Sequence, residues 1–436
     1  METVEFIYNL TWGEIPAEVQ MQARRCLLDT FGAAIAGRGT ELSRIIHDFS
    51  ATAFQGSGAK LWQDGRQVSP PGAALANAMT IDSFDIHDGH KLVKGHAGAA
   101  VVPAALATIS LDKKGVVSGQ EFLATLVMGY EIALRAGIAL HATACDFHTS
   151  GAWNTLGAAA VTSRRLGLQA EQTRHALGIA EYHGPRSPMM RDIDFPTMVK
   201  DGSGWGAMAG VSAGMMAASG FTGAPALTVE GKEVTELWSD LGERWRILEV
   251  YFKPYAVCYW AQPAVVGALA VQKKYQLNPQ SIRKIRVFTF HQATRLAIRR
   301  PANTEEAQYS LAYPVAAALV HGRLGSAELI GENLRDPLTL RLAEAVEPVE
   351  DPALSAQFPA QRFARVQIET VDGKLYEIGE TTARWEPSQP PTDEELLEKF
   401  RWLAGANLSE PATAEIEGGL WNCASLPDIQ ALIENL

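Results

Sequence analysis

Alanine- and glycine-rich segments with a helical pattern of apolar residues run from about residue 15 to residue 220. The clearest of them are residues 99–109, 119–141, 155–166 and 205–218. Apolar residues that recur every three or four positions form one face of a helix, and small side chains on that face let helix backbones approach closely. The pattern therefore predicts a compact bundle of helices, and a chain of 436 residues is long enough to bury a large core.

After the helical region the pattern changes. Residues 285–290 alternate between apolar and polar side chains, which predicts a strand. Residues 363–370 and 375–378 predict the two strands of a β-hairpin, and the Asp-Gly dipeptide between them predicts a primed turn. Residues 309–321 predict a helix between these strands. This part of the chain therefore indicates a small α/β unit.

These patterns predict a mostly α protein with two domains. Residues 1–250 and 393–436 would form a large helical domain from both ends of the chain, with a smaller α/β lid domain inserted at residues 251–392. The proline-rich run at residues 387–391 predicts the crossover back to the helical domain.

Charge and cysteine content exclude several kinds of partner. The formal net charge is −11, whereas nucleic-acid binding depends on clustered Lys and Arg. The first residues are acidic and lack the basic and apolar regions of a signal peptide. The cysteines are far apart and form no Cys-x-x-Cys pair, which is typical of reduced thiols and gives no support for a zinc or iron–sulfur site. We expect a soluble cytoplasmic protein that binds neither nucleic acid nor membrane.

The densest group of titratable residues is the segment 85–96. It contains the run DIHDGH at residues 85–90, followed by two lysines and a third histidine, His96. Such a density of charge costs free energy to fold unless a site uses it, and either metal binding or proton transfer at carbon would explain it. The carboxylates and imidazoles of residues 85–90 lack the tight spacing of a metal motif such as H-E-x-x-H, so we expect no metal.

Three junctions in the helical region combine a cationic side chain with small residues at a predicted helix N-terminus. They are Lys94-Gly95-His96, residues 147–151 (FHTSG) and residues 200–204 (KDGSG). Free backbone N–H groups and the helix dipole at such ends attract anions, and glycine lets the anion approach closely. Three junctions in one domain predict a receptor for a substrate with several carboxylates.

The same groups suit the removal of a proton next to a carboxylate. Removing that proton creates a dianionic aci-carboxylate, which a lysine and backbone N–H groups would stabilise. A histidine with a pKa near neutrality would act as the base. The residues therefore predict acid/base chemistry on a small polycarboxylate.

Seven segments in order along the chain resemble the signature blocks of the MmgE/PrpD family. They are residues 28–37 (LDTFGAAIAG), residues 85–90, residues 96–103, His148 with residues 157–160, residues 197–200 (TMVK), residues 252–255 (FKPY) and residues 309–313 (YSLAY). The resemblance extends over nearly the whole chain. It implies a helical domain from both chain ends, an inserted α/β lid, a homodimer, and no metal or organic cofactor.

The resemblance also implies roles for particular residues. Carried over by position, the implied pocket residues are Asp85, His96, His148, Lys200, Lys253 and Tyr313. The aspartate and the two histidines would be acid/base groups, the lysines would hold substrate carboxylates, and the tyrosine would donate a proton or a hydrogen bond. Asp88 and His90, from the same motif as Asp85, are further substrate-binding candidates.

This chain departs from the family pattern after Lys253. The family often shows C-C-R-x-x-H after K-P-Y, whereas residues 257–262 are VCYWAQ. Tyr259 stands near the place of an arginine that would fork onto a carboxylate, and it cannot replace that charge. We count Tyr259 among the substrate-binding candidates and expect Arg186 to supply a cation from another direction. In the earlier aspartate block, Gly89 replaces a threonine.

The leading interpretation is a cofactor-free hydro-lyase similar to 2-methylcitrate dehydratase, a member of that family. A decarboxylase of the cis-aconitate type, and an epimerase or isomerase of a dicarboxylate, need the same base, acid and carboxylate contacts, so the sequence leaves them open. From other classes, a non-catalytic carboxylate-binding protein and a metal-dependent hydrolase remain alternatives.

Overall fold

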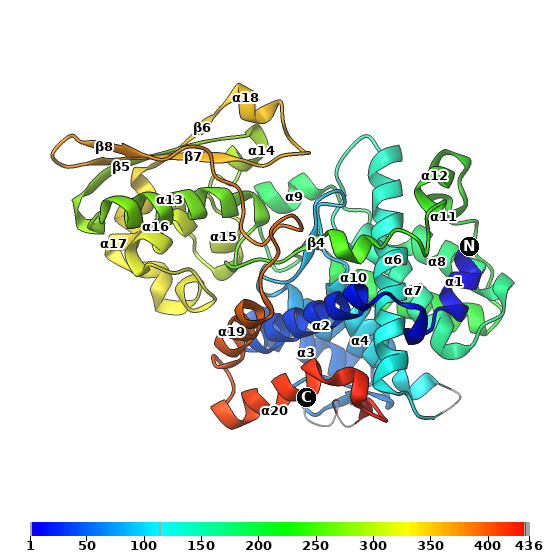
Figure 1. Cartoon of the computed structure of the whole chain (residues 1–436). Helices are drawn as coiled ribbons and strands as arrows, with labels where there is room; N and C mark the ends of the chain where they lie inside the picture. Colours follow the sequence, from blue (N-terminus) through cyan, green and yellow to red (C-terminus); the bar gives the residue numbers. More distant parts are fainter. Residues whose placement is uncertain (1, 113–114, 431, 433–436) are drawn as a thin grey trace.

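Helices make up most of the computed structural model, which describes residues 2–112, 115–430 and 432. The predicted mostly α fold is confirmed. A larger helical lobe lies beside a smaller lobe that contains a sheet (Figure 1). The helices of the larger lobe are α1 (Thr3–Asn9), α2 (Ala17–Gly37), α3 (Glu41–Ala53), α4 (Pro70–Asp82), α5 (Gly98–Ala107), α6 (Gly119–Thr143), α7 (Gly151–Leu166), α8 (Ala170–His183), α9 (Met189–Asp194), α10 (Ser203–Ala218), α11 (Leu227–Glu230), α12 (Thr235–Trp238), α19 (Asp393–Ala404) and α20 (Glu410–Trp421).

Close helix packing in the larger lobe depends on small residues. Helix α10 packs against α7 and α4, and all three are rich in alanine and glycine. A Cβ atom added to Gly210 would lie 2.4 Å from the backbone oxygen of Thr155, so the backbones of α10 and α7 approach this closely only because residue 210 is glycine. The small-residue pattern thus sets how tightly this lobe packs.

The longest apolar helix is α6, which has the length and hydropathy of a membrane-crossing helix. Within its most apolar window, 94% of the residues are buried inside the structure. A helix that is hydrophobic on all sides is expected at the centre of a large core, and α6 lies there among α5, α7 and the N-terminal helices.

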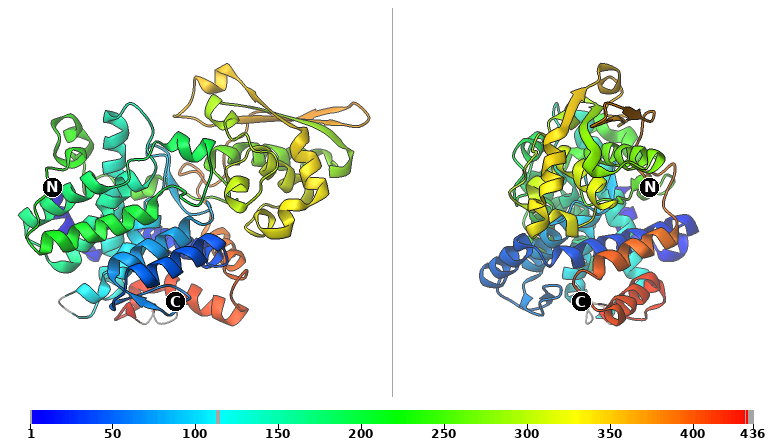
Figure 2. Two further views of the ribbon diagram at one scale, coloured as in Figure 1. Left: turned by 180° about the vertical axis from the view of Figure 1, so that it is seen from behind. Right: turned by 90° about the vertical axis from the view of Figure 1, so that its left-hand side faces the viewer.

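The two ends of the chain meet in the larger lobe, where α19 lies beside α2 (Figure 2). Lys399 of α19 donates to the carboxylate of Asp29 at 2.5 Å and to the backbone oxygen of Ile86 at 2.7 Å. Helix α19 therefore supports the 85–90 segment through Lys399. The predicted C-terminal segment 393–436 is helical as far as it is described; residue 431 and residues 433–436 lie outside the described part.

The smaller lobe contains a four-stranded sheet in the order β6-β5-β7-β8. Its elements are α13 (Gln262–Tyr275), β5 (Ile282–Thr289), α14 (His291–Thr294), α15 (Thr304–Gln308), α16 (Ala312–His321), α17 (Pro337–Ala345), β6 (Val346–Glu350), α18 (Pro352–Ser355), β7 (Ala364–Thr370) and β8 (Leu375–Glu377). Strands β5 and β6 are parallel, whereas β7 is antiparallel to both β5 and β8. Helices α13, α16 and α17 lie on one side of this sheet (Figure 1).

The turn of the predicted hairpin differs from the expectation. The N–H of Gly373 donates to the carbonyl of Thr370 at 2.9 Å, and Gly373 has a φ of 79°. Asp372 does not have a positive φ, which a primed turn with Asp-Gly at its centre requires. The prediction of a primed turn is therefore wrong: this is a three-residue connection with glycine at the left-handed position.

Candidate active site

A short antiparallel pair fixes the 85–90 segment against the chain that leads to Lys253. Strand β3 (Gly89–His90) pairs with β4 (Val250–Tyr251), and Gly89 lies opposite Tyr251. A Cβ atom on Gly89 would lie 2.5 Å from the Tyr251 hydroxyl, so a threonine does not fit at this position. The pairing brings Lys253 next to Asp85.

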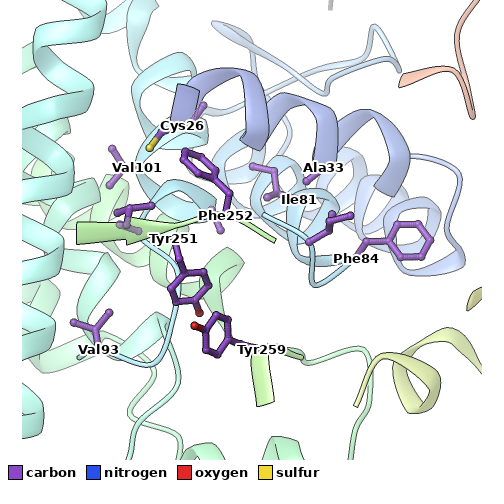
Figure 3. Packing of buried hydrophobic residues seen from close by; sticks show 14 of the residues in the cluster. Cys26, Ala33, Ile81, Phe84, Val93, Val101, Tyr251, Phe252 and Tyr259 are labelled. Atoms are coloured by element: carbon purple, nitrogen blue, oxygen red, sulfur yellow. The ribbon is translucent and has the colours of Figure 1, made fainter. Parts of the chain in front are cut away.

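A cavity of about 40 Å³ lies where the two lobes meet. Asp85, His96, Lys253 and Tyr259, all predicted from the sequence, line it. Tyr251 and Tyr259 both line this cavity, and their rings lie 4.1 Å apart, centroid to centroid. Figure 3 shows these two side chains next to each other. The structure thus brings these four candidates together.

Asp85 and Lys253 form a buried ion pair. The Lys253 ammonium contacts Oδ1 of Asp85, and it lies 3.3 Å from the Asp85 backbone oxygen. The backbone N–H of Asp85 donates to Oε1 of Gln308 at 2.8 Å. Burial alone would raise the pKa of Asp85, but the Lys253 ammonium and His96 hold that pKa well below its usual value. Asp85 is therefore a carboxylate at neutral pH.

The hydrogen bonds of His96 fix its tautomer. Its Nδ1 lies 2.6 Å from the backbone oxygen of Asp88, and a carbonyl oxygen only accepts, so Nδ1 carries the hydrogen. Its Nε2 lies 3.4 Å from Oδ1 of Asp85. Burial, together with the nearby His87 and Lys253, lowers the pKa of His96 to about 4. The imidazole is therefore neutral at pH 7, and its Nε2 can accept a proton beside a carboxylate that would stabilise the imidazolium.

The start of α7 holds His96 in place. The backbone N–H of His96 donates to Oγ of Ser150 at 2.8 Å, and the side chain of Asn154 donates to the backbone oxygen of His96 at 3.1 Å. The Ser150 hydroxyl also contacts the carboxylate of Asp201. Ser150 is therefore the residue of the segment 147–151 that contacts His96. It lies next to the predicted helix start.

His87 and His96 raise the question of a metal site. Their rings are 4.3 Å apart, and donor atoms of Asp85, His87 and His96 lie within 4.8 Å of one another. However, the Lys253 ammonium already contacts Asp85, and Nε2 of His87 lies 3.1 Å from a carboxylate oxygen of Asp82. A cation bound at Asp85 would have to displace or face this ammonium, so the donor set suits an internal ion pair better than a dication.

Lys200 lies behind the cavity wall. Its ammonium donates to Oε1 of Gln308 at 2.8 Å and lies 4.8 Å from the centroid of the Tyr309 ring. Gln308 is the same residue that accepts from Asp85, so one amide links both predicted groups to α15 of the smaller lobe. Lys200 lines a neighbouring cavity of about 520 Å³, and Asp192 lies between the two cavities and lines both.

Three predicted residues lie away from the small cavity. Nδ1 of His148 is 3.5 Å from a carboxylate oxygen of Asp146, and His148 does not line the cavity. Arg186 is half-exposed, and its nearest acidic partner is Glu181 at 3.9 Å. Tyr313 is buried in the smaller lobe, where its hydroxyl donates to backbone oxygens of Glu328 and Asn333 at 3.2 and 2.9 Å.

Asp88 and His90 are buried but do not line the cavity. Asp88 accepts hydrogen bonds from Thr30 at 3.4 Å and from Tyr130 at 3.3 Å. Burial and the nearby Asp29 carboxylate raise the pKa of Asp88 to about 8. Nε2 of His90 lies 3.3 Å from a carboxylate oxygen of Glu249. Their partners therefore belong to the surrounding protein and not to the lining of the cavity.

Further polar residues that were not among the candidates also line the cavity. They include Asp192, Asp201, Tyr251, Tyr309 and Arg362. Burial raises the pKa of Asp192 to about 7, with Lys200 opposing the rise. No local motif marks Asp192 or Arg362. Their position depends on how α9 and the loop before β7 meet the larger lobe.

A helical lobe and an α/β lobe that enclose a neutral histidine, an aspartate and a lysine define a class of two-lobed proteins suited to acid/base chemistry. The comparisons with known proteins give this class a family. The model of the MmgE/PrpD N-terminal domain matches residues 2–241, and that of the MmgE/PrpD C-terminal domain matches residues 255–420. The chain belongs to the MmgE/PrpD family.

Relatives within this family are enzymes that act on carboxylic acids. The chain is 25% identical to a cis-aconitate decarboxylase of Aspergillus terreus, over 100% of this chain and 95% of the relative. It is 25% identical to the human cis-aconitate decarboxylase, over 98% of this chain and 92% of the relative. It is also 25% identical to a mitochondrial 2-methylcitrate dehydratase of Yarrowia lipolytica, over 90% of this chain and 82% of the relative.

Proposed function

We propose that this protein is a lyase that removes a proton next to a carboxylate of a small polycarboxylate, without a cofactor. The observation that carries the proposal is the neutral His96, whose unprotonated Nε2 lies 3.4 Å from the ion-paired carboxylate of Asp85 in a lined cavity. The names of the relatives, decarboxylase and dehydratase, agree with this reaction class.

Each group in the cavity has a part in this chemistry. Nε2 of His96 accepts the proton from carbon, and Asp85 stabilises the imidazolium that forms. The ammonium of Lys253 faces the substrate carboxylate as it gains negative charge, which lowers the energy of the aci-carboxylate. Lys200, whose ammonium lies over the ring of the cavity-lining Tyr309, adds positive charge near the cavity.

Asp192 is the proposed proton donor. It lines the cavity, is buried, and has one carboxylate oxygen without a hydrogen-bond partner among the described residues. Its pKa of about 7 leaves a protonated fraction at neutral pH, which suits a general acid. In a dehydration, the electrons of the broken C–H bond form the double bond, and the hydroxyl leaves as water with the proton of Asp192.

A decarboxylase is the second candidate, because cis-aconitate decarboxylases from fungi and from mammals are among the relatives. In that reaction the bond to the carboxylate breaks, CO2 leaves, and its electron pair passes to the carbon skeleton, which a neighbouring acid then protonates. Both reactions need an acid and cations that hold the substrate carboxylates, whereas only the dehydration needs a base that removes a proton from carbon. An epimerase would return the proton to the opposite face of the same carbon.

Proton NMR in D2O tests the proposal with purified protein and a panel of 2-methylcitrate, citrate, cis-aconitate and iminodisuccinate. We expect deuterium to enter next to a carboxylate of at least one member. A new alkene signal with loss of the hydroxyl-bearing substrate indicates dehydration, whereas loss of one carboxylate carbon as CO2 indicates decarboxylation. If no member binds or exchanges, the proposed function is wrong.

We also propose that the protein forms a homodimer, as the family resemblance implies. Exposed apolar side chains gather at one place, where Phe195, Val199 and Trp205 line the 520 Å³ cavity. Contiguous exposed apolar surface marks a protein contact. Light scattering of the wild type and of Val199→Glu tests this, with Val371→Glu on the exposed hairpin as the control. A monomeric wild type would contradict the dimer.

The cytoplasmic location of the protein stays a prediction.

A further inference from the structure

Arg362 reaches the cavity from the smaller lobe and lines it together with Asp85. It lies in the connection between α18 and β7, and only 1% of its surface is exposed. One Nη2 hydrogen bond joins it to the backbone oxygen of Lys91 in the larger lobe, at 2.9 Å. Its Nε has no hydrogen-bond partner among the described residues. The guanidinium therefore closes the cavity and still has donors to offer.

Aromatic rings hold the guanidinium but do not neutralise it. Its central carbon lies 4.9 Å from the centroid of the Tyr259 ring and 5.9 Å from that of Phe358. The Tyr251 hydroxyl is its polar side-chain neighbour, and Tyr251 also packs against Tyr259. Cation–π contacts offset part of the cost of burying a charge, and they fix the plane in which a bidentate ligand would bind.

Most other buried lysines and arginines in the described part of the chain have carboxylate partners. Those that contact a carboxylate within 4.0 Å are Arg135, Arg165, Arg246, Lys253 and Lys399. Arg362 makes no such ion pair among the described residues, and neither does Lys200, which donates to Gln308. A buried charge without a counter-charge is strongly unfavourable unless a ligand supplies one.

We propose that Arg362 binds a carboxylate of the substrate that is remote from the reacting carbon. This inference rests on the proposed function and assigns two of the substrate's carboxylates: one faces Lys253 and the other pairs with Arg362. Tyr259 stands near the place where the family pattern has an arginine, and the guanidinium of Arg362 lies over the ring of this tyrosine. Arg362 thus supplies from the smaller lobe the charge that the Tyr259 position lacks.

Binding of a substrate carboxylate by Arg362, here called the anchor, also couples ligand binding to the arrangement of the lobes. The cavity of about 40 Å³ has space for only a few water molecules, so a polycarboxylate enters only when the walls separate. Arg362 belongs to the smaller lobe, whereas Lys253 and Asp85 are held by the β3–β4 pair. A dicarboxylate that bridges the two cations would favour the closed arrangement of the lobes, and a monocarboxylate would not.

Calorimetric titration with tricarballylate and with propionate tests the anchor on the full chain. The variants are Arg362→Met and Arg362→Lys, and Arg365→Met on β7 is the matched control because that half-exposed arginine pairs with Asp351. We expect Arg362→Met to weaken tricarballylate roughly 10- to 100-fold and to leave propionate unchanged. Arg362→Lys keeps the positive charge but lacks the planar, two-pronged guanidinium. Its affinity for tricarballylate should lie between those of the wild type and Arg362→Met. Arg365→Met should bind both as the wild type does.

Chemical rescue separates a bound carboxylate from a structural role. Added ethylguanidinium should restore part of the tricarballylate affinity of Arg362→Ala, because it returns a guanidinium to the gap, and should have no effect on Arg365→Ala. Equal weakening of both acids, or no rescue, would overturn the anchor. Unchanged tricarballylate affinity in Arg362→Met would overturn the anchor alone, since the deuterium exchange of the wild type would still support the lyase. A wild type that binds neither acid and exchanges no deuterium would overturn both.

Discussion

Nε2 of His96 lies 3.4 Å from Oδ1 of Asp85, while Nδ1 of the same ring is tied to the backbone oxygen of Asp88 at 2.6 Å. The first contact supplies a charge for an imidazolium, and the second decides which nitrogen is free to accept a proton. Because Asp85 is already paired with Lys253, its carboxylate stays ionised throughout. This arrangement supports the proposal that His96, not Asp85, is the base.

His96→Gln should lower the rate of deuterium exchange by roughly 100- to 10,000-fold, because it removes the proton acceptor. Thermal stability should change little, since a glutamine can still interact with the Asp88 carbonyl. Exchange rates by NMR and melting by circular dichroism check this. His47→Gln is the control: His47 is buried in the same lobe and contacts Asp64 and Thr80, so that variant should melt earlier but keep its exchange rate. Wild-type exchange in His96→Gln would exclude it as the base.

The pH profile should show a falling limb from Asp192. A general acid must be protonated, and its pKa of about 7 means that the active fraction drops about tenfold per pH unit above that value. The pKa of His96, about 4, places its loss by protonation well below neutral pH. We expect kcat/KM to be flat from about pH 5 to 7 and to fall above it. In Asp192→Asn the rate should be roughly 100-fold lower, without that limb. A limb that persists in Asp192→Asn belongs to another group.

The parts of the site that the sequence could predict are those concentrated in one segment or one motif. Asp85 and His96 lie within twelve residues, so their density is visible without any structure. Lys253 was found through the K-P-Y resemblance, and the structure adds the reason it meets Asp85, namely the β3–β4 pairing. Arg362 and Asp192 lie in segments without a local pattern. They reach the cavity only through the way the lobes meet, which no spacing rule describes.

Long-range packing also decides what a single side chain does. His148 follows the expected pattern at a helix start, yet the backbone places Ser150, two residues later, against His96. The Asp372-Gly373 dipeptide fits two kinds of hairpin connection, and the pairing of β7 with β8 selects the longer one. In both cases the residue types predicted the kind of local structure, but the sequence did not predict which residue of the segment makes the contact or how long the connection is.

Asp88→Asn should stabilise the protein increasingly as pH rises. Burial, with the Asp29 carboxylate, raises the pKa of Asp88 to about 8 from an ordinary value of 3.8. A raised pKa contributes stability that is fully present below pH 3.8 and is lost as pH rises towards 8, because only the unfolded state releases its proton in that range. An asparagine has no proton to lose. The variant should therefore gain up to about 1.4 kcal/mol per pH unit over the wild type between those values. Urea unfolding at pH 5, 6.5 and 8 checks this, and an offset that does not depend on pH would contradict it.

Exhaustive chelation should leave the exchange activity unchanged. The Lys253 ammonium occupies the Asp85 oxygen that a dication would need, although Asp85, His87 and His96 have suitable donor atoms. Activity after dialysis against EDTA, with metal content measured by mass spectrometry, checks the prediction. Activity that is lost and then restored by one added metal would support the hydrolase alternative and would require Lys253 to move.

Tyr313→Phe should keep its exchange activity and lose about 1–2 kcal/mol of stability. The buried Tyr313 hydroxyl donates to backbone oxygens of Glu328 and Asn333, and its removal leaves those acceptors without that donor. Tyr309→Phe is the informative contrast, because Tyr309 lines the cavity and its hydroxyl bonds to Asp192.

Removing the Tyr309 hydroxyl takes away a hydrogen bond that lowers the pKa of Asp192, so the falling limb of the pH profile should move to higher pH. Tyr313→Phe should leave that limb where it is, because the Tyr313 hydroxyl, among the described residues, bonds to backbone oxygens of its own lobe. Initial rates from pH 5 to 9 for both variants make the comparison. Tyr313→Phe could instead abolish exchange while its melting changes only as expected. In that case the Tyr313 hydroxyl reaches the substrate after the lobes move, and Tyr313 is the proton donor, as the family resemblance implies.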